Sequence, residues 1–252
     1  MAIGGKFDDY IEGISSGKFD TQKVVFWGGY QTDSGVSYNI INPLGIAIAH
    51  SGEAITVLIS SSSASDSGSG TGARTVYITG LNAAYVEIAE IVTTNGQTAV
   101  STVNSYLRIL GIRVLTAGSS NSAAGTVYVG SGAVTVGVPA VVYNYCTSED
   151  NSWNVATYTV PAGYKFFISN VSLINGDWNL GVYFSLNVRT LGSSVWWASG
   201  KGQVFGAANI PFTPYFAIDE KSDLSMTSKD GGGTQGVYTL ISGYLRAKSL
   251  DI

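Results

Sequence analysis

The sequence has few charged residues, since Asp, Glu, Lys and Arg make up only 12% of its 252 residues, about half of the usual share. Its 13 Lys and Arg are scattered along the chain, and the net charge is −4. Neutralising nucleic-acid phosphates requires clustered cations, so we expect no nucleic-acid partner. A surface with so few ions is suited to being covered by neighbouring proteins, because covering it removes few ions from water.

Cysteine and histidine each occur once. Cys146 can form no intrachain disulfide, and we interpret it as a small buried apolar residue. A Ser-His-acid triad would have to use His50, but its neighbours Ala49 and Ser51 show no nucleophile-elbow pattern. A Cys146–His50 dyad is possible in space but has no support in the sequence. One Cys and one His fall short of the usual zinc ligands, so we predict no catalytic residue, metal or cofactor.

Long apolar runs and long stretches with a helical apolar period are also missing. The longest nearly apolar run, residues 134–145, is too short to span a membrane and contains Gly and Pro. The first ten residues, MAIGGKFDDY, lack the apolar core of a secretion signal. We therefore expect no membrane partner, and synthesis in a cytoplasm without export by the general secretion route.

What the sequence does contain is a succession of short strand-like segments separated by Gly, Ser and Asn. Apolar and polar residues alternate around Val76 and Ile78 and again around Val86 and Ile88, which is typical of half-buried antiparallel strands. The segment VVFWGGY is apolar and predicts a Gly-Gly bend. Many short strands with frequent turns predict an all-β fold, an antiparallel β-sandwich or jelly roll.

The best domain boundary lies between Gly130 and Pro139. We therefore predict an N-terminal arm over residues 1–20, a first β-sandwich over 21–135 and a second over 136–252. One large sandwich is the alternative. In the arm, Phe7, Tyr10, Ile11 and Ile14 have helix-like spacing, although nearby glycines weaken a helix.

The Gly-rich segment from Asp66 to Gly72 resembles a phosphate-binding loop only superficially. Such a loop requires Lys-Ser or Lys-Thr followed by a helix, whereas here Ala73-Arg74-Thr75 begins a strand. We interpret residues 60–72 as a long flexible loop. Arg74 is expected to form a surface ion pair or to meet an anionic partner.

Carboxylates occur in turn-like segments at Glu149-Asp150, Asp219-Glu220 and Asp223, but no twelve-residue calcium loop is present. We interpret them as solvated turns. A pair of carboxylates for sugar hydrolysis remains an open alternative, because strands bring distant residues together.

Aromatic residues are enriched, with 15 Tyr and 5 Trp. We predict that Trp178, Trp196 and Trp197 take part in an interface, with stacking on glycan rings as the alternative. Trp196 and Trp197 are adjacent, so in a strand they would point to opposite faces, one into the core and one outward.

The order of several segments resembles virion structural proteins of tailed bacteriophages, cyanophages included. The resemblance extends from about residue 24 to residue 241. Its segments are FWGGY, GTGARTVYITGLNAAYVEIAEIVTTNGQTAVSTVNSYLRILGIRVLTAG, GTVYVGSG, YTVPAGYKFFI and FAIDEKSDLSM.

This resemblance implies a β-rich component of a virion and no enzyme. Within that class we favour a capsid decoration, or cement, protein bound outside the shell to the major capsid protein, self-associated as a homotrimer or homodimer. Phe7, Tyr10, Ile11 and Ile14 are then the candidate anchors of a capsid-binding arm. The alternatives are a tail, baseplate or head-fibre component that binds host glycans and an enzyme acting on polysaccharide.

Overall fold

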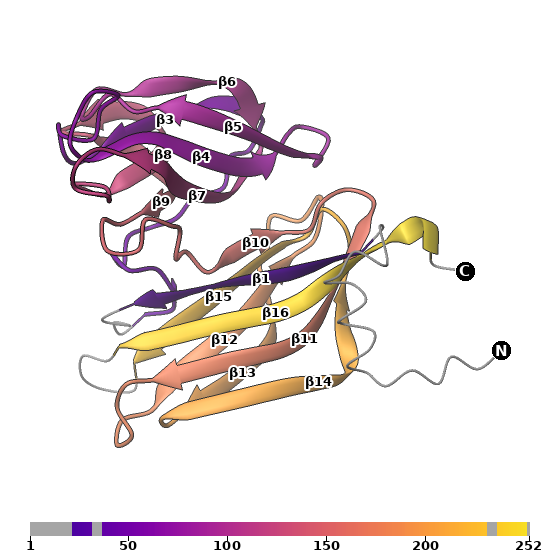
Figure 1. Ribbon diagram of the computed structural model, residues 1–252. Coiled ribbons are helices and arrows are strands. Elements are labelled where there is room, and N and C mark those ends of the chain that lie inside the picture. The colour runs from indigo at the N-terminus through magenta and orange to yellow at the C-terminus, as the bar shows by residue number, and fades with distance from the viewer. Residues whose placement is uncertain (1–21, 32–36, 231–235, 251–252) are drawn as a thin grey trace.

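The computed structural model describes residues 22–31, 37–230 and 236–250, which form two stacked lobes of antiparallel sheets (Figure 1). The prediction of an all-β, sandwich-type fold is confirmed. Within these ranges the one helical element is η1 (Lys248–Leu250), a single 3-10 turn. The same part of the chain contains no helix that is long and apolar enough to cross a membrane.

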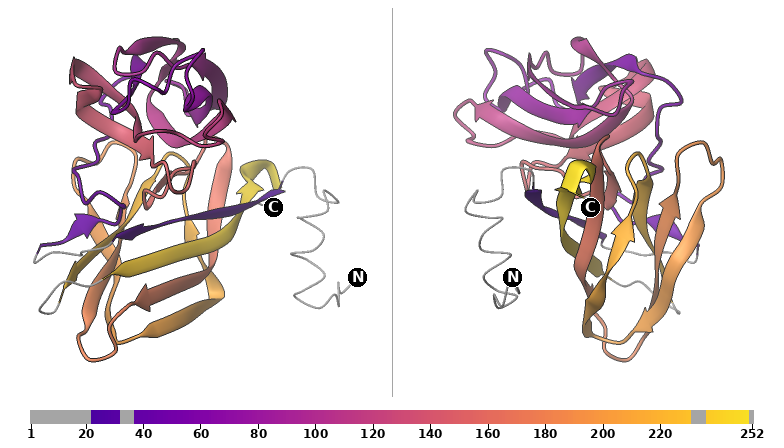
Figure 2. Two further views of the ribbon diagram at one scale, coloured as in Figure 1. Left: turned by 60° about the vertical axis from the view of Figure 1, so that its left-hand side comes forward. Right: turned by 90° about the vertical axis from the view of Figure 1, so that its right-hand side faces the viewer.

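The lower lobe in Figure 1 consists of two sheets packed face to face, seen edge-on in the right view of Figure 2. The first has the order β1 (Gln22–Gln31), β16 (Val237–Ala247), β11 (Tyr164–Asn175), β14 (Ala207–Ile218). The second has the order β10 (Thr157–Thr159), β15 (Asp223–Asp230), β12 (Val182–Arg189), β13 (Trp197–Val204), and β2 (Asn39–Ile40) also pairs with β15. Their facing sides bury one apolar core that includes Trp27, Phe166, Phe184, Leu224 and Ile241.

The upper lobe also consists of two sheets. One has the order β6 (Val100–Tyr106), β3 (Ile55–Ser61), β8 (Val127–Thr135), β9 (Val138–Cys146), and the other the order β5 (Glu87–Thr93), β4 (Ala73–Leu81), β7 (Arg108–Ala117). Val57, Ile78, Ile112 and Val129 are central in its core, and Cys146 is buried among them, as predicted.

Strand pairing crosses the predicted domain ranges at two places. β1, near the start of the chain, pairs along its whole length with β16, near the end. β9 lies beyond residue 135 but pairs with β8 of the upper lobe. The upper lobe is thus inserted in the sequence between β2 and β10 of the lower lobe. β1 is apolar, and such a strand is most stable where it completes a sheet over a core.

The predicted Gly-Gly bend in VVFWGGY is wrong, since β1 runs unbroken from Gln22 to Gln31. The two glycines serve close approach instead. A Cβ atom on Gly28 would lie 2.1 Å from the carbonyl oxygen of Thr239, and one on Gly29 would lie 2.5 Å from that of Asn154. Only glycine fits against backbone at such distances.

The sequence predicts a long flexible loop over residues 60–72. In the structure a buried carboxylate holds this loop in place instead. Asp66 accepts hydrogen bonds from the backbone N–H groups of Ala73, Ala124 and Gly125 at 2.6, 2.7 and 3.0 Å. The Ser61 hydroxyl donates to its second oxygen. These four bonds tie the Gly-rich segment to β3, β4 and the chain before β8, and they compensate for the burial of the charge.

Candidate functional site

The outer surface of the first sheet of the lower lobe, which faces the viewer in Figure 1, is free of charged residues over three rows of four. We call these rows the uncharged face. They are Tyr30, Tyr238, Ile174 and Ala207; Gly28, Leu240, Ser172 and Asn209; and Phe26, Ser242, Asn170 and Pro211.

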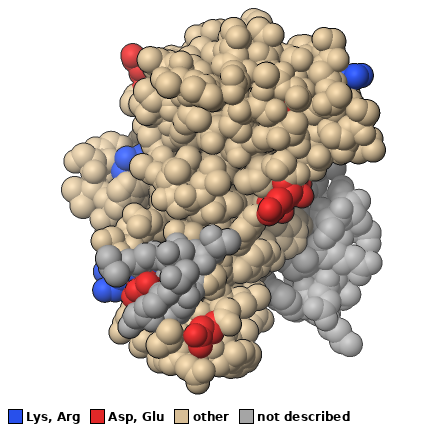
Figure 3. Space-filling model, turned by 90° about the vertical axis from the view of Figure 1, so that its left-hand side faces the viewer, with Lys and Arg blue, Asp and Glu red and all other residues tan. Residues whose placement is uncertain are grey.

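Large apolar side chains project from this face. Phe26 is 61% exposed and Ile174 is 45% exposed, and Tyr238 pairs directly with Ile174. Their neighbours in sequence, such as Trp27 and Leu173, point into the core, as strand alternation requires. On another side of the molecule a few charged residues of both signs are scattered among uncharged ones (Figure 3). Covering such a surface costs little ion desolvation.

Trp178, one of the three predicted interface aromatics, is 72% exposed in the loop between β11 and β12. Its indole lies directly against Gly206, where a Cβ atom would come within 2.3 Å of the ring. Gly206 also has a φ of +74°, which other residues rarely adopt. The indole is thus held in place while most of its surface remains accessible.

Trp178 precedes the first residue of β12, whereas Trp197 of β13 pairs with Val188 near the last residue of β12. Trp196 and Trp197 therefore lie at the opposite end of this strand from Trp178. Trp197 is 44% exposed. Trp196 is half-buried, but it contacts the imidazole of His50 and the guanidinium of Arg189 rather than the apolar core. The prediction that one of this pair fills the core is therefore wrong, and the three Trp residues form no single patch.

A buried carboxylate joins the two lobes. Asp223 of β15 accepts two hydrogen bonds from Arg108 of β7 at 2.7 and 3.0 Å, two from Arg189 of β12 at 3.0 and 2.6 Å, and one from the Thr159 hydroxyl at 2.7 Å. Burial opposes ionisation of Asp223, but the hydrogen bonds and charge of Arg108 outweigh it and lower its pKa to about 2. The predicted reading of Asp223 as a solvated turn is wrong.

His50 lies beside this cluster, in the segment that leads from β2 to β3. Burial lowers its pKa to about 4, so the imidazole is neutral near pH 7. Its Nε2 atom is out of contact with solvent and has no hydrogen-bond partner in the described chain. Cys146 lies in the upper core, where burial raises its pKa to about 12. No hydrogen bond joins these two residues in the described structure, so the geometry offers no dyad.

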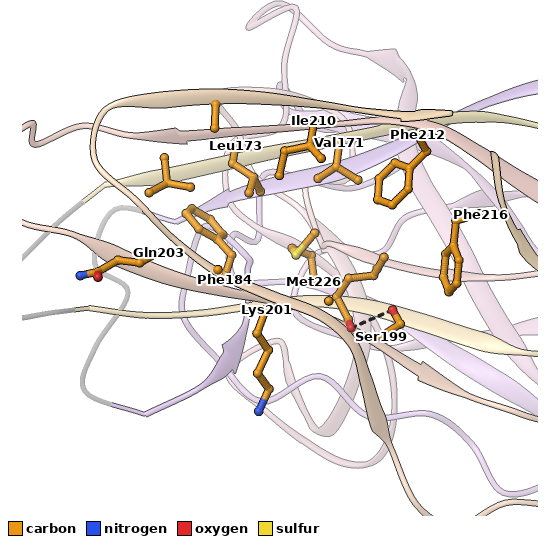
Figure 4. A pocket seen from close by; sticks show the side chains of 15 residues that line it. Val171, Leu173, Phe184, Ser199, Lys201, Gln203, Ile210, Phe212, Phe216 and Met226 are labelled. Carbon is orange, nitrogen blue, oxygen red and sulfur yellow. Dashed lines mark hydrogen bonds between the residues drawn. The ribbon is translucent and has the colours of Figure 1, made fainter. Parts of the chain in front are cut away.

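An apolar cleft opens between the two sheets of the lower lobe where β13 and β14 form their edges (Figure 4). Its volume is about 320 Å³, and Leu173, Phe184, Phe212 and Phe216 are among the side chains that line it. The Lys201 amine points away from these rings. The cleft is an open edge of the core, and most of the described side chains that line it are apolar.

Two of the other predicted turn carboxylates form exposed contacts. Asp150 accepts a hydrogen bond from Tyr30, and Glu220 pairs with Lys248 at 2.9 Å. Arg74 donates to the carbonyl of Gly70 in its own loop. Among the residues that the structure describes, no three His, Cys, Asp or Glu side chains are placed to hold a metal ion. The candidate arm anchors Phe7, Tyr10, Ile11 and Ile14 lie outside the described residues.

Folding also gathers basic residues that are scattered in sequence. Arg108, Arg189 and Lys221 line one cavity of about 240 Å³ at the lobe junction. Lys201 and Lys229 both lie over the ring of Tyr38. The sequence contained one signal for this polar surface. Alternation in DLSMTSKD places four polar residues on one face of a strand: Asp223, Ser225, Thr227 and Lys229.

No family model matches the chain, and none of the curated proteins matches its sequence. Among solved structures, the chain is similar to two from cowpea mosaic virus. The first is the structure of the top component, the naturally occurring empty particles, and the second is that of an empty virus-like particle. Identities are 9% and 11%, coverage is 78% of this chain and 83% or 82% of the other, and both TM-scores are 0.21. The infectious bursal disease virus Gx strain gives 8% identity, coverage of 91% and 77%, and a TM-score of 0.22. Overlap this low carries no argument about function.

Proposed function

We propose that this chain is a structural component of a bacteriophage virion, a capsid decoration protein that binds the outside of the shell and stabilises it. The sequence resemblance suggests the class. The observation that carries the proposal is the uncharged face, with Phe26, Ile174 and Tyr238 exposed over a rigid sheet.

A decoration protein stabilises a shell by burying surface against several subunits at once, so that many modest contacts act together. The uncharged face suits the centre of such an interface, where charged residues are depleted and aromatic residues are enriched. A sheet supported by a packed core loses little conformational freedom on docking, which favours binding. Self-association as a trimer or dimer at the symmetry axes of the shell is part of the proposal.

The proposal is tested by adding the purified protein to phage heads that lack it and measuring occupancy by sedimentation and cryo-electron microscopy. Phe26→Lys and Ile174→Lys each place a charge in the proposed interface. We expect each to lower affinity at least tenfold, because an unpaired ammonium would have to be desolvated. Val103→Lys is the matched control, since Val103 on β6 is 89% exposed and lies on the other lobe.

Melting temperatures of the three variants within a few degrees of the parent establish that each is folded. Unchanged occupancy with both variants would refute docking through the uncharged face. Failure of the parent protein to bind heads, together with specific adhesion to host cells, would favour the tail or fibre alternative.

A further inference from the structure

A polar groove crosses the outer surface of the second sheet of the lower lobe. Its volume is about 420 Å³, within the range of sites for small ligands. The residues that line it include Tyr38, Ser185, Asn187, Trp196, Lys201 and Thr227. The uncharged face belongs to the other sheet, so the groove is a separate surface.

The lining of the polar groove combines the aliphatic residues Ile40, Ile46, Ala47 and Ile48 with a floor of hydroxyl and amide groups. Ser185 and Asn187 come from β12, and Ser225 and Thr227 come from β15, alternating with the core residues of both strands. The Asn187 amide donates to the Thr227 hydroxyl at 2.9 Å and its oxygen accepts from Ser185 at 2.8 Å. This network holds the side chains in fixed positions, as a hydrogen-bonding surface for a hydroxyl-rich ligand requires.

One end of the polar groove combines an aromatic ring with two ammonium groups. The Nζ atoms of Lys201 and Lys229 lie 5.5 and 5.3 Å from the ring centroid of Tyr38. Neither lysine forms an ion pair with a described residue. Their charges are therefore available to an anionic group that reaches Tyr38.

Trp196 also lines the polar groove and lies against His50 and Arg189, which line the junction cavity. The Cζ atom of Arg189 lies 4.7 Å from the centroid of the Trp196 indole. The centroid of the His50 imidazole lies 5.8 Å from that of the same indole. Arg189 uses Nε and Nη2 to bind Asp223, so its Nη1 group has no partner in the described chain. The Nζ of Lys221 likewise forms no hydrogen bond or ion pair there.

The charge of this surface is opposite to that of the whole protein. Arg108, Arg189, Lys221, Lys201 and Lys229 lie in or beside the polar groove and the junction cavity, and among the described residues the one carboxylate that lines either is Asp223. Five of the chain's 13 basic residues are therefore gathered here although its net charge is −4. Such a local excess attracts anions.

We propose that the polar groove, with the adjoining junction cavity, binds an acidic oligosaccharide whose carboxylates lie near Lys201 and Lys229 at one end and Arg189 and Lys221 at the other. The sugar rings lie between Tyr38 and Trp196, above the hydroxyl and amide floor. Shell binding through the uncharged face is a different property and does not enter this proposal. A single-stranded nucleic acid fits less well, because it carries a phosphate at every step while Lys201 is the one cation among the described residues that line the groove.

Isothermal titration calorimetry on the full chain tests the proposal with three probes: tetragalacturonate, its neutral methyl ester and a tetramer of thymidylate. We expect saturable binding of tetragalacturonate that weakens as the salt concentration is raised, because screening acts on exposed charges. Binding of the ester and of the thymidylate is expected to be at least tenfold weaker.

Variants locate the site. Lys201→Gln combined with Lys229→Gln is expected to weaken binding about fivefold. Tyr38→Phe keeps the ring and is expected to bind as the parent does, whereas Tyr38→Ala is expected to weaken binding. Arg113→Gln is the matched control, since Arg113 lies 4.9 Å over the ring of Tyr77 in the upper lobe and is also exposed.

Three results would overturn the proposal. They are no heat of binding with millimolar tetragalacturonate, equal or tighter binding of the ester or the thymidylate, and undiminished binding by the folded double lysine variant. Retention of the parent's melting temperature shows that a loss of binding in any variant is local.

Discussion

The surroundings of His50 oppose protonation of its imidazole. Burial is the main cause of its low pKa of about 4, and Arg108 and Arg189 add to it, while Asp223 acts in the opposite direction. In an unfolded chain the same side chain titrates near pH 6.5. Between these values the unfolded chain binds a proton that the folded chain does not, so acidification destabilises the fold.

We therefore expect His50 to remove up to roughly 3 kcal/mol of folding free energy as the pH falls from about 7 to 4. Urea unfolding of the parent and of His50→Gln at pH 7, 5.5 and 4 measures this. The difference in stability between the two proteins should shift in favour of the variant across that window and level off below pH 4. Parallel pH profiles would show that His50 is not held neutral.

At the scale of the strand, β1 requires glycine where it lies against backbone. Gly28→Ala would place a Cβ atom 2.1 Å from the Thr239 carbonyl oxygen, so the strand must move away from β16. We expect a loss of about 2–4 kcal/mol in the free energy of unfolding, measured in urea. Gly52→Ala is the control, because a Cβ atom there meets nothing within 4 Å. Equal stabilities would contradict the close approach.

The strands themselves were the most predictable level of this fold. Alternation around Val76 and Ile78 marks the segment seen as β4, because side chains of a half-buried strand alternate between core and solvent. Around Val86 and Ile88 the same pattern was misleading, since Val86 is exposed and β5 begins after it. Which strands pair was not predictable. β1 and β16 are separated by two hundred residues, and no local pattern specifies such a partner. The position of Asp66 was equally hidden, because its four donors come from three separate segments.

The candidate sites show the same limit. Exposed Trp178 and Trp197 could be singled out from composition, but the partners of Trp196 come from separate segments at His50 and Arg189. Lys201 and Lys229 are far apart in the sequence and looked scattered. The order of the strands, which the sequence does not reveal, brings both to the ring of Tyr38. The uncharged face depends on the register of four strands, and hence on pairings across the whole chain.

At the scale of the whole molecule, Asp223 couples the two lobes. The Arg108 side chain reaches it from the upper lobe, while Thr159 and Arg189 hold it from the lower lobe. Such an arrangement makes the two cores unfold together, because opening the junction leaves charges without partners in a poorly hydrated site. We expect one calorimetric transition for the parent protein.

Asp223→Asn removes the anion and leaves Arg108 and Arg189 facing each other across a neutral amide. Breaking a buried pair in this way costs about 3–5 kcal/mol, and we expect the calorimetric transition to split into two, one for each lobe. Asp219→Asn is the control, because Asp219 is mostly exposed and its contact with Lys165 is 3.9 Å long. That change should cost less than about 1 kcal/mol and leave a single transition. If Asp223→Asn also unfolds in one step, the lobes must be coupled by the packing of β7 against β10 and by the chain around residues 46–48 rather than by this carboxylate.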